Sequence, residues 1–150
     1  STRSDNGTSG SGGGSTSSLR DMAYKTHQQI NAYRNDRGLP SLKWSDVVHR
    51  ECMDHSRSMA RSGDLSHSGF SRRAANIRKK TGAGGCAENV AFNWNASNPV
   101  ANAVRSWINS SGHHKNLTGN FSHTAVAVAR AANGAYYFTQ MFYKQGRAGQ

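Results

Sequence analysis

The last third of the chain carries a two-strand pattern that limits the fold more narrowly than any other segment. An apolar run over residues 124–129 is followed by the dipeptide Asn133-Gly134 and then by an aromatic run over residues 136–143. Asn-Gly between two such runs favours a tight hairpin, because both residues tolerate the positive φ angles of its turn. The first run has the continuous apolar character of a buried strand. The sequence therefore predicts an antiparallel hairpin within a sheet.

Helical periodicity dominates the chain before this hairpin. Between residues 45 and 61, Val48, Cys52 and Met59 recur at helical spacing, and Gly63 is typical of a C-terminal stop. His55 lies on the same stripe, so we interpret it as a core or boundary residue with satisfied hydrogen bonds. The predicted helices run from residue 19 to the stop at Gly38, over residues 45–61, over residues 71–80, and onward from the N-cap pair Asn98-Pro99.

These elements together predict an α+β fold. Residues 89–92 are apolar enough to add another strand beside the hairpin. Amphipathic helices must bury their apolar faces against such a sheet. We therefore expect an α-β-α sandwich around a small, mainly antiparallel central sheet. With 150 residues, the chain is long enough for one domain with its own core.

The two ends of the chain differ from this domain. Residues 1–18 are mostly Ser, Gly and Thr, a composition typical of a flexible linker or tail. We assign the folded domain to residues 19–145 and a short tail to residues 146–150. No run of 18 apolar residues occurs, so no transmembrane helix is predicted. Five Asn-x-Ser/Thr sequons favour a secreted protein.

The charge of the chain is strongly asymmetric. The formal net charge is +11, and from Leu65 onward a single acidic residue, Glu88, stands against ten Lys and Arg. Such a surface attracts polyanions. We expect an exposed basic cluster on the helix over residues 71–80, either as a solvated face or as a site for an acidic glycan or an anionic membrane surface. Nucleic-acid stacking would need interleaved aromatic residues, which this segment lacks, so no sequence-specific nucleic-acid partner is expected. The cluster comprises Arg72, Arg73, Arg78, Lys79 and Lys80.

The isolated Glu88 has two interpretations. It is either a structural anchor for nearby N–H groups or arginines, or a working group, as a general base or a metal-associated acid. His67 upstream and His113 downstream make the second interpretation worth pursuing. Two cysteines, Cys52 and Cys86, do not have a zinc-site spacing and allow either one disulfide or two buried thiols.

Several short segments now form a recognisable set. They are the Leu-Ser-His ending at His67, the Ala-Glu-Asn-Val-Ala around Glu88 and the Trp-to-Leu segment of residues 107–117. In this order they resemble the CAP superfamily of cysteine-rich secretory proteins, antigen-five allergens and plant pathogenesis-related proteins, in its compact branch. Residues 31–44 are similar to the first-helix signature of the family, and residues 138–142 to its last strand. The resemblance covers the chain from about Leu19 to Lys144 and implies an α-β-α sandwich.

The resemblance also implies a central cleft with two histidines and two glutamates. His67 and His113 match the histidines, and Glu88 matches one glutamate. Ser110 stands where the family usually has the other glutamate, so this chain carries a triad. Some members of the family bind zinc in this cleft. Cleft-rim or bracing roles follow for Asn89, Ser110, His114 and Asn116.

Three functions are compatible with the sequence. In the first, an extracellular monomer binds a divalent cation such as zinc between the two imidazoles of its cleft, or a small ligand there. The resemblance implies a sterol or another lipid as that ligand, since some members of the family bind such molecules. In the second, the triad is a hydrolytic centre with Glu88 as base, which the missing second glutamate disfavours. In the third, the basic cluster binds an acidic glycan or a membrane surface.

Overall fold

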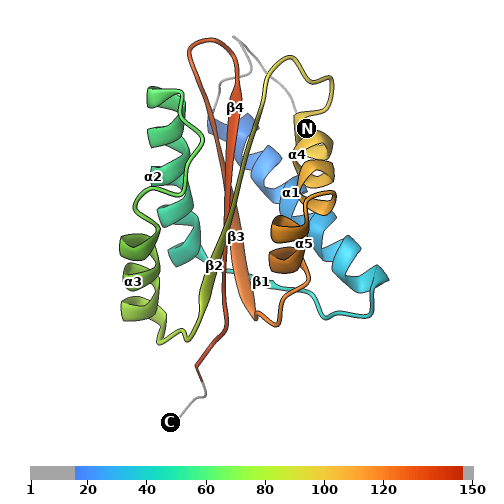
Figure 1. Cartoon of the computed structure of the whole chain (residues 1–150), viewed down its shortest axis with the longest axis vertical. Coiled ribbons are helices and arrows are strands. Elements are labelled where there is room, and N and C mark those ends of the chain that lie inside the picture. The colour runs from blue at the N-terminus through green and yellow to red at the C-terminus, as the bar shows by residue number, and fades with distance from the viewer. Residues whose placement is uncertain (1–15, 147–150) are drawn as a thin grey trace.

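The computed structural model describes residues 16–146, which fold into a single α-β-α sandwich (Figure 1). The first helix, α1, begins at Thr16, three residues before the predicted start. The predicted linker otherwise falls on residues 1–15, and most of the predicted tail on residues 147–150; both lie outside the described residues. The elements are α1 (Thr16–Asp36), β1 (Lys43–Trp44), α2 (Asp46–Ser62), α3 (Phe70–Thr81), β2 (Cys86–Asn93), α4 (Pro99–Ile108), α5 (Ser111–Leu117), β3 (His123–Arg130) and β4 (Tyr136–Tyr143).

The sheet has four strands in the order β1-β3-β4-β2. The strand pairs β2–β4 and β3–β4 are antiparallel over eight residues each, and only the short β1 runs parallel to β3. Helices α2 and α3 cover one face of the sheet, and α1, α4 and α5 cover the other (Figure 1). The predicted fold class is therefore confirmed, with β1 and α5 as elements that the sequence patterns did not indicate.

The predicted hairpin joins β3 to β4 through residues 131–135. Gly134 has a φ of 90°, and the Asn133 side chain accepts a hydrogen bond of 3.0 Å from the Ala135 N–H. Asn133 itself has no positive φ, so the connection is a longer loop with one left-handed residue, Gly134, rather than a two-residue turn with positive φ at both residues. The turn sets the register in which Arg130 faces Tyr136 and Thr124 faces Phe142.

Local capping explains where the second helix begins and ends. The Ser45 hydroxyl accepts a hydrogen bond from the Val48 N–H, and Gly63 closes the helix with a φ of 76°. Val48, Cys52, His55 and Met59 are buried along one stripe, as predicted. Caps thus set the ends of α2, and apolar spacing sets the face that packs on the sheet.

The core has one large cluster on each face of the sheet, and a smaller third cluster includes Met59 and Tyr137. Trp107, Phe138 and Phe142 lie in the cluster under α1 and α4, while Val48, Ile77 and Met141 lie in the one under α2 and α3. Cys52 is buried in the second cluster and Cys86 is partly buried beside it, and both are free cysteines, so the alternative of a disulfide is not realised. Among the described residues, no helix is both long and apolar enough to cross a bilayer.

Candidate functional site

The centre of the candidate site is a buried ion pair between strand β2 and helix α3. Arg73 Nε donates to Glu88 Oε2 at 2.7 Å, and Arg73 Nη2 donates to Glu88 Oε1 at 2.8 Å. The side chains are 5% and 1% exposed. This bidentate geometry is the strongest that an arginine and a carboxylate can form. The structural interpretation of Glu88, as an anchor for N–H groups or arginines, agrees with this contact, although the sequence did not indicate which arginine is the partner.

Arg73 therefore does not belong to the exposed basic cluster in which the sequence analysis placed it. It is buried together with Ala74 and Ile77 on the inner face of α3, and its neighbour Arg72 is exposed. Arg73 lies four residues before Ile77 and three after Phe70, so helical spacing already puts it in the apolar stripe. That spacing is the signal that could have identified it.

The same arginine shapes the loop that carries His67. Its Nη1 donates to the Ser68 carbonyl at 2.7 Å and its Nη2 to the His67 carbonyl at 3.3 Å. Gly69 has a φ of 83°, and a Cβ atom there would lie 3.1 Å from Arg73 Nη1. Glycine at this position thus lets the loop turn tightly over the guanidinium.

His67 is held against the ion pair by one ring nitrogen. Its Nδ1 lies 2.8 Å from Glu88 Oε1. Because a carboxylate can only accept, Nδ1 is the donor, and a neutral His67 ring keeps its lone pair on Nε2. The side chain of His67 is 54% exposed, so this nitrogen is accessible. Glu88 orients His67 as a carboxylate orients a metal-binding histidine.

A second histidine, His55, completes the arginine's hydrogen bonds. Arg73 Nη1 donates to His55 Nδ1 at 3.0 Å, and His55 Nε2 lies 2.7 Å from the Ser66 carbonyl. Burial lowers the pKa of His55, and the positive charge of Arg73 lowers it further, although the bond to Ser66 opposes both. The buried, hydrogen-bonded His55 anticipated from the helix stripe is found, as part of the support for the site.

His113 comes from the short helix α5 on the opposite face of the sheet. Its Nδ1 lies 2.9 Å from the hydroxyl of Ser110, the N-cap residue of that helix. Burial lowers the pKa of His113, and the nearby His67 lowers it further. His113 is therefore neutral over a wider pH range than an ordinary histidine. Ser110, which the resemblance places where a second glutamate is usual, is thus in direct contact with His113.

Two asparagines fasten α5 to strand β2. Asn116 Nδ2 donates to Asn89 Oδ1 at 2.9 Å and to the Glu88 carbonyl at 3.3 Å, and Asn89 Nδ2 donates to the His113 carbonyl at 3.1 Å. Both act as braces. The fourth rim candidate, His114, points to a different neighbour, because its Nε2 lies 2.7 Å from the hydroxyl of Tyr33 in α1.

Few protein atoms at this site are available as ligands for a metal ion. Within residues 16–146, no group of three or more His, Cys, Asp or Glu side chains is arranged to bind a metal. Both Glu88 oxygens are committed to Arg73 and His67. The Nε2 atoms of His67 and His113 remain, since no hydrogen bond engages them in the described structure. Two imidazoles fit a weakly bound, exchangeable cation better than a structural one.

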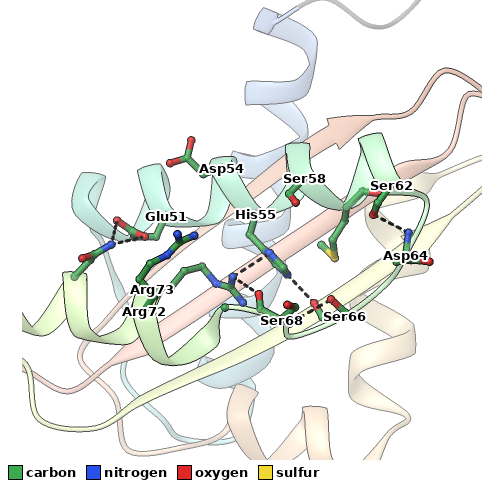
Figure 2. Close-up of a pocket in the computed structure, with 13 residues that line it drawn as sticks. Glu51, Asp54, His55, Ser58, Ser62, Asp64, Ser66, Ser68, Arg72 and Arg73 are labelled. Atoms are coloured by element: carbon green, nitrogen blue, oxygen red, sulfur yellow. Dashed lines mark hydrogen bonds between the residues drawn. The ribbon is translucent and has the colours of Figure 1, made fainter.

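A cavity of about 810 Å³ lies on the other side of Arg73, between α2 and α3. Figure 2 shows Arg73 and His55 at its floor, with Ser66 and Ser68 beside them. His67, Glu88 and His113 do not line this cavity. Arg73 thus separates it from the histidine site, and the cavity is distinct from the cleft expected from the sequence. Its lining is polar, with Glu51, Asp54 and Asp64 on its rim.

Comparisons with known proteins agree with this architecture. A profile of the cysteine-rich secretory protein family, CAP, matches residues 27–142. No curated protein sequence gives a significant match. An outer surface protein of Borrelia burgdorferi is similar in fold, with a TM-score of 0.73, 15% identity, and coverage of 85% of this chain and 96% of the other.

Two further solved structures share the fold. An extracellular protein of Bacillus anthracis that contains an SCP domain has a TM-score of 0.66 and 24% identity over 90% of this chain. A cysteine-rich secretory protein of Staphylococcus aureus has a TM-score of 0.68 and 19% identity over 87% of it. The chain spans 45% and 41% of those two proteins.

Proposed function

The chain belongs to the cysteine-rich secretory protein (CAP) family, and from that premise we propose that it is an extracellular binding protein whose cleft takes a divalent cation, zinc above all, between His67 and His113. The observation that carries this proposal is the orientation of the two rings. Each histidine has its Nδ1 engaged, by Glu88 or by Ser110, and its Nε2 unengaged.

Neutral imidazole nitrogens are ordinary ligands for zinc, and a hydrogen bond on the opposite ring nitrogen is the usual means of orienting them. Here a carboxylate fixes the proton of His67. A serine hydroxyl can donate or accept, so Ser110 permits a proton on Nδ1 of His113 without enforcing it. The two histidines are therefore unequal, and we expect weak binding.

The remaining coordination positions of such a cation would be open to water or to a donor atom of a small ligand. A ligand with a hydroxyl, such as a sterol or another lipid, would suit this arrangement, in keeping with the resemblance noted in the sequence. A bound zinc ion would act as a Lewis acid toward that donor atom.

A hydrolytic function has less support. The carboxylate that would serve as a general base, Glu88, already accepts two hydrogen bonds from Arg73 and one from His67. Its buried side chain has little contact with solvent. The geometry favours an orienting role for Glu88 over proton abstraction.

The proposal is tested by calorimetric titration of the protein with zinc chloride. We expect a weak 1:1 binding isotherm that disappears in His67→Ala/His113→Ala. His114→Ala is the matched control, since it removes a histidine of the same helix that is engaged by Tyr33. Equal binding heats in the wild type and the double variant would remove the proposal.

Ser110→Glu tests the same proposal through an expected gain in zinc affinity. A carboxylate at this position would accept from His113 Nδ1 and leave Nε2 as the metal donor, as Glu88 does for His67. We expect zinc affinity to rise roughly tenfold or more, in line with the effect of outer-shell carboxylates. An affinity unchanged by Ser110→Glu, in a folded variant, would argue that His113 is not a ligand.

A further inference from the structure

A small apolar cluster lies at the end of the molecule where the β3–β4 turn projects, at the top of Figure 1. Its buried members include Met59, Val90 and Tyr137, and it is flanked by the partly buried Ala60 and Ala131. The cluster thus joins the C-terminal part of α2, strand β2 and the β3–β4 turn. The side chains around this cluster are exposed aromatic rings and arginines, whereas those of the histidine site are joined by hydrogen bonds.

Two large aromatic side chains stand exposed beside this cluster. Phe92 is 51% exposed and stacks on Tyr137 with ring centroids 5.5 Å apart. Trp94 is 58% exposed, and its Nε1 donates to the Asn133 carbonyl in the β3–β4 turn at 2.9 Å. Both rings are fixed on one side and open to solvent on the other. Because such half-exposed rings are already held in place, they lose little conformational freedom when they bind an apolar partner.

Three arginines gather on the other flank of the same turn. Arg57, Arg61 and Arg130 line one groove of about 300 Å³, and no acidic residue lines it. The other lining residues are the alanines at positions 60, 129, 131 and 132.

The charges of these arginines are unpaired within the described part of the chain. Arg57 and Arg61 make no hydrogen bond or ion pair there, and the guanidinium of Arg130 lies 5.3 Å from the Tyr136 ring centroid. The next acidic residue after Arg61, Asp64, lines the separate cavity between α2 and α3. Convergent cations without a counterion create a local site of positive potential.

We propose that this end of the molecule, formed by Arg57, Arg61, Arg130, Phe92 and Trp94, docks on an anionic lipid bilayer. The arginines attract acidic headgroups, and the two rings enter the interfacial layer, where Trp and other aromatic side chains are favoured. The presence of both arginines and exposed rings favours a lipid bilayer over a sulfated glycan. A glycan would pair with the arginines but offers no apolar layer to the rings. The surface is independent of the two histidines, so its test does not depend on zinc binding.

The basic cluster predicted from the sequence keeps four exposed residues on α3, Arg72, Arg78, Lys79 and Lys80. The exposed basic residues Arg78, Lys79 and Lys80 of α3 have no exposed large aromatic residue beside them in the described structure. They therefore provide a control of identical charge. Neutralising either set removes three positive charges from the chain.

Vesicle sedimentation tests the proposal with the whole chain, using phosphatidylcholine vesicles with and without phosphatidylserine. We expect binding only to the mixed vesicles. Arg57→Gln/Arg61→Gln/Arg130→Gln should weaken the partition coefficient roughly 100-fold. Arg78→Gln/Lys79→Gln/Lys80→Gln should weaken it much less. Equal losses in the two variants, or equal binding to pure phosphatidylcholine, would overturn the assignment.

Tryptophan fluorescence reports on the rings directly. On addition of mixed vesicles, emission should shift to the blue, because Trp94 is half exposed on the proposed surface, whereas Trp107 is fully buried and the partly buried Trp44 lies in β1, outside that surface. The shift should vanish in Trp94→Ser, and Trp94→Phe should retain vesicle binding that Trp94→Ser weakens. Retention on heparin that depends on the three arginines, without any vesicle binding, would assign the surface to an acidic glycan and contradict our proposal.

Discussion

The histidine site and the end of the molecule around the β3–β4 turn both use arginine, in opposite ways. Arg73 is 4% exposed and spends all three guanidinium nitrogens on Glu88, His55 and the carbonyls of the loop that carries His67. At the turn, Arg57 and Arg61 are exposed and make no hydrogen bond within the described residues. One region neutralises its charge internally, and the other leaves it for an external partner.

This difference distinguishes charges that stabilise the fold from charges that are available to bind a partner. A buried cation must have a counterion and hydrogen-bond acceptors, or its desolvation destabilises the fold. An exposed cation is solvated and contributes little to stability. Loss of the first kind should therefore show in unfolding experiments, and loss of the second kind in binding experiments.

The sharpest contrast is between adjacent residues of α3. Arg73→Ala leaves Glu88 buried without its partner and should lower the free energy of unfolding by about 3–5 kcal/mol. Arg72→Ala, at an exposed neighbour, should change it by less than about 0.5 kcal/mol. Urea denaturation measures both. In Arg73→Met/Glu88→Leu, part of the loss should be recovered, and similar values for Arg72→Ala and Arg73→Ala would contradict the comparison.

A smaller effect is expected at the brace between β2 and α5. Asn89→Ala removes the donor to the His113 carbonyl and the acceptor for Asn116, and should cost about 1–3 kcal/mol. Asn102→Ala on α4, where the residue is exposed, is the control and should have little effect or stabilise slightly. Urea denaturation provides the comparison. Zinc affinity should fall in Asn89→Ala alone if the brace holds His113 in position.

Acidification should destabilise the histidine site through His55. Burial lowers the pKa of His55 from 6.5, so the unfolded state binds a proton more readily than the folded one. The associated stability is present above pH 6.5 and is lost as the pH falls through 6.5 toward the lowered pKa. His55→Gln keeps one donor and one acceptor, so its unfolding free energy should depend less on pH in this window. An unchanged slope would exclude His55 as the source.

The exposed arginines should produce the smallest stability change. Arg57→Gln/Arg61→Gln removes a like-charge pair at i, i+4 spacing, and it also removes cations near the C-terminus of α2, where they are favourable. These contributions oppose each other, so thermal and urea unfolding should change by about 0.5 kcal/mol or less. A loss of several kcal/mol would mean that these arginines are structural after all.

Much of the fold was predictable because its signals are local. Asn133-Gly134 placed the turn, Ser45 and Gly63 bounded α2, and spacing selected the stripe of Val48, Cys52 and Met59. The short helix α5 and the two-residue β1 were missed. Elements of this length carry too few residues to show a period, and β1 exists through its pairing with β3.

The candidate site was only partly predictable. The motif order pointed to His67, Glu88 and His113 as candidates, and the resemblance implied that Ser110 stands where the family usually has a glutamate. The roles of Arg73 and His55 followed from packing, since each contacts residues on other elements.

The sequence by itself determined the longer elements, their order and the family, because caps, turns and periodicity act between neighbours in the chain. Only the tertiary structure decided which partner the internal arginine of α3 binds. Arg73 and Arg72 are chemically identical, but fifteen residues later Glu88 lies opposite one of them and not the other. Likewise, Phe92, Trp94 and the three arginines form one surface only because β2, α2 and the β3–β4 turn meet at the same end of the sheet.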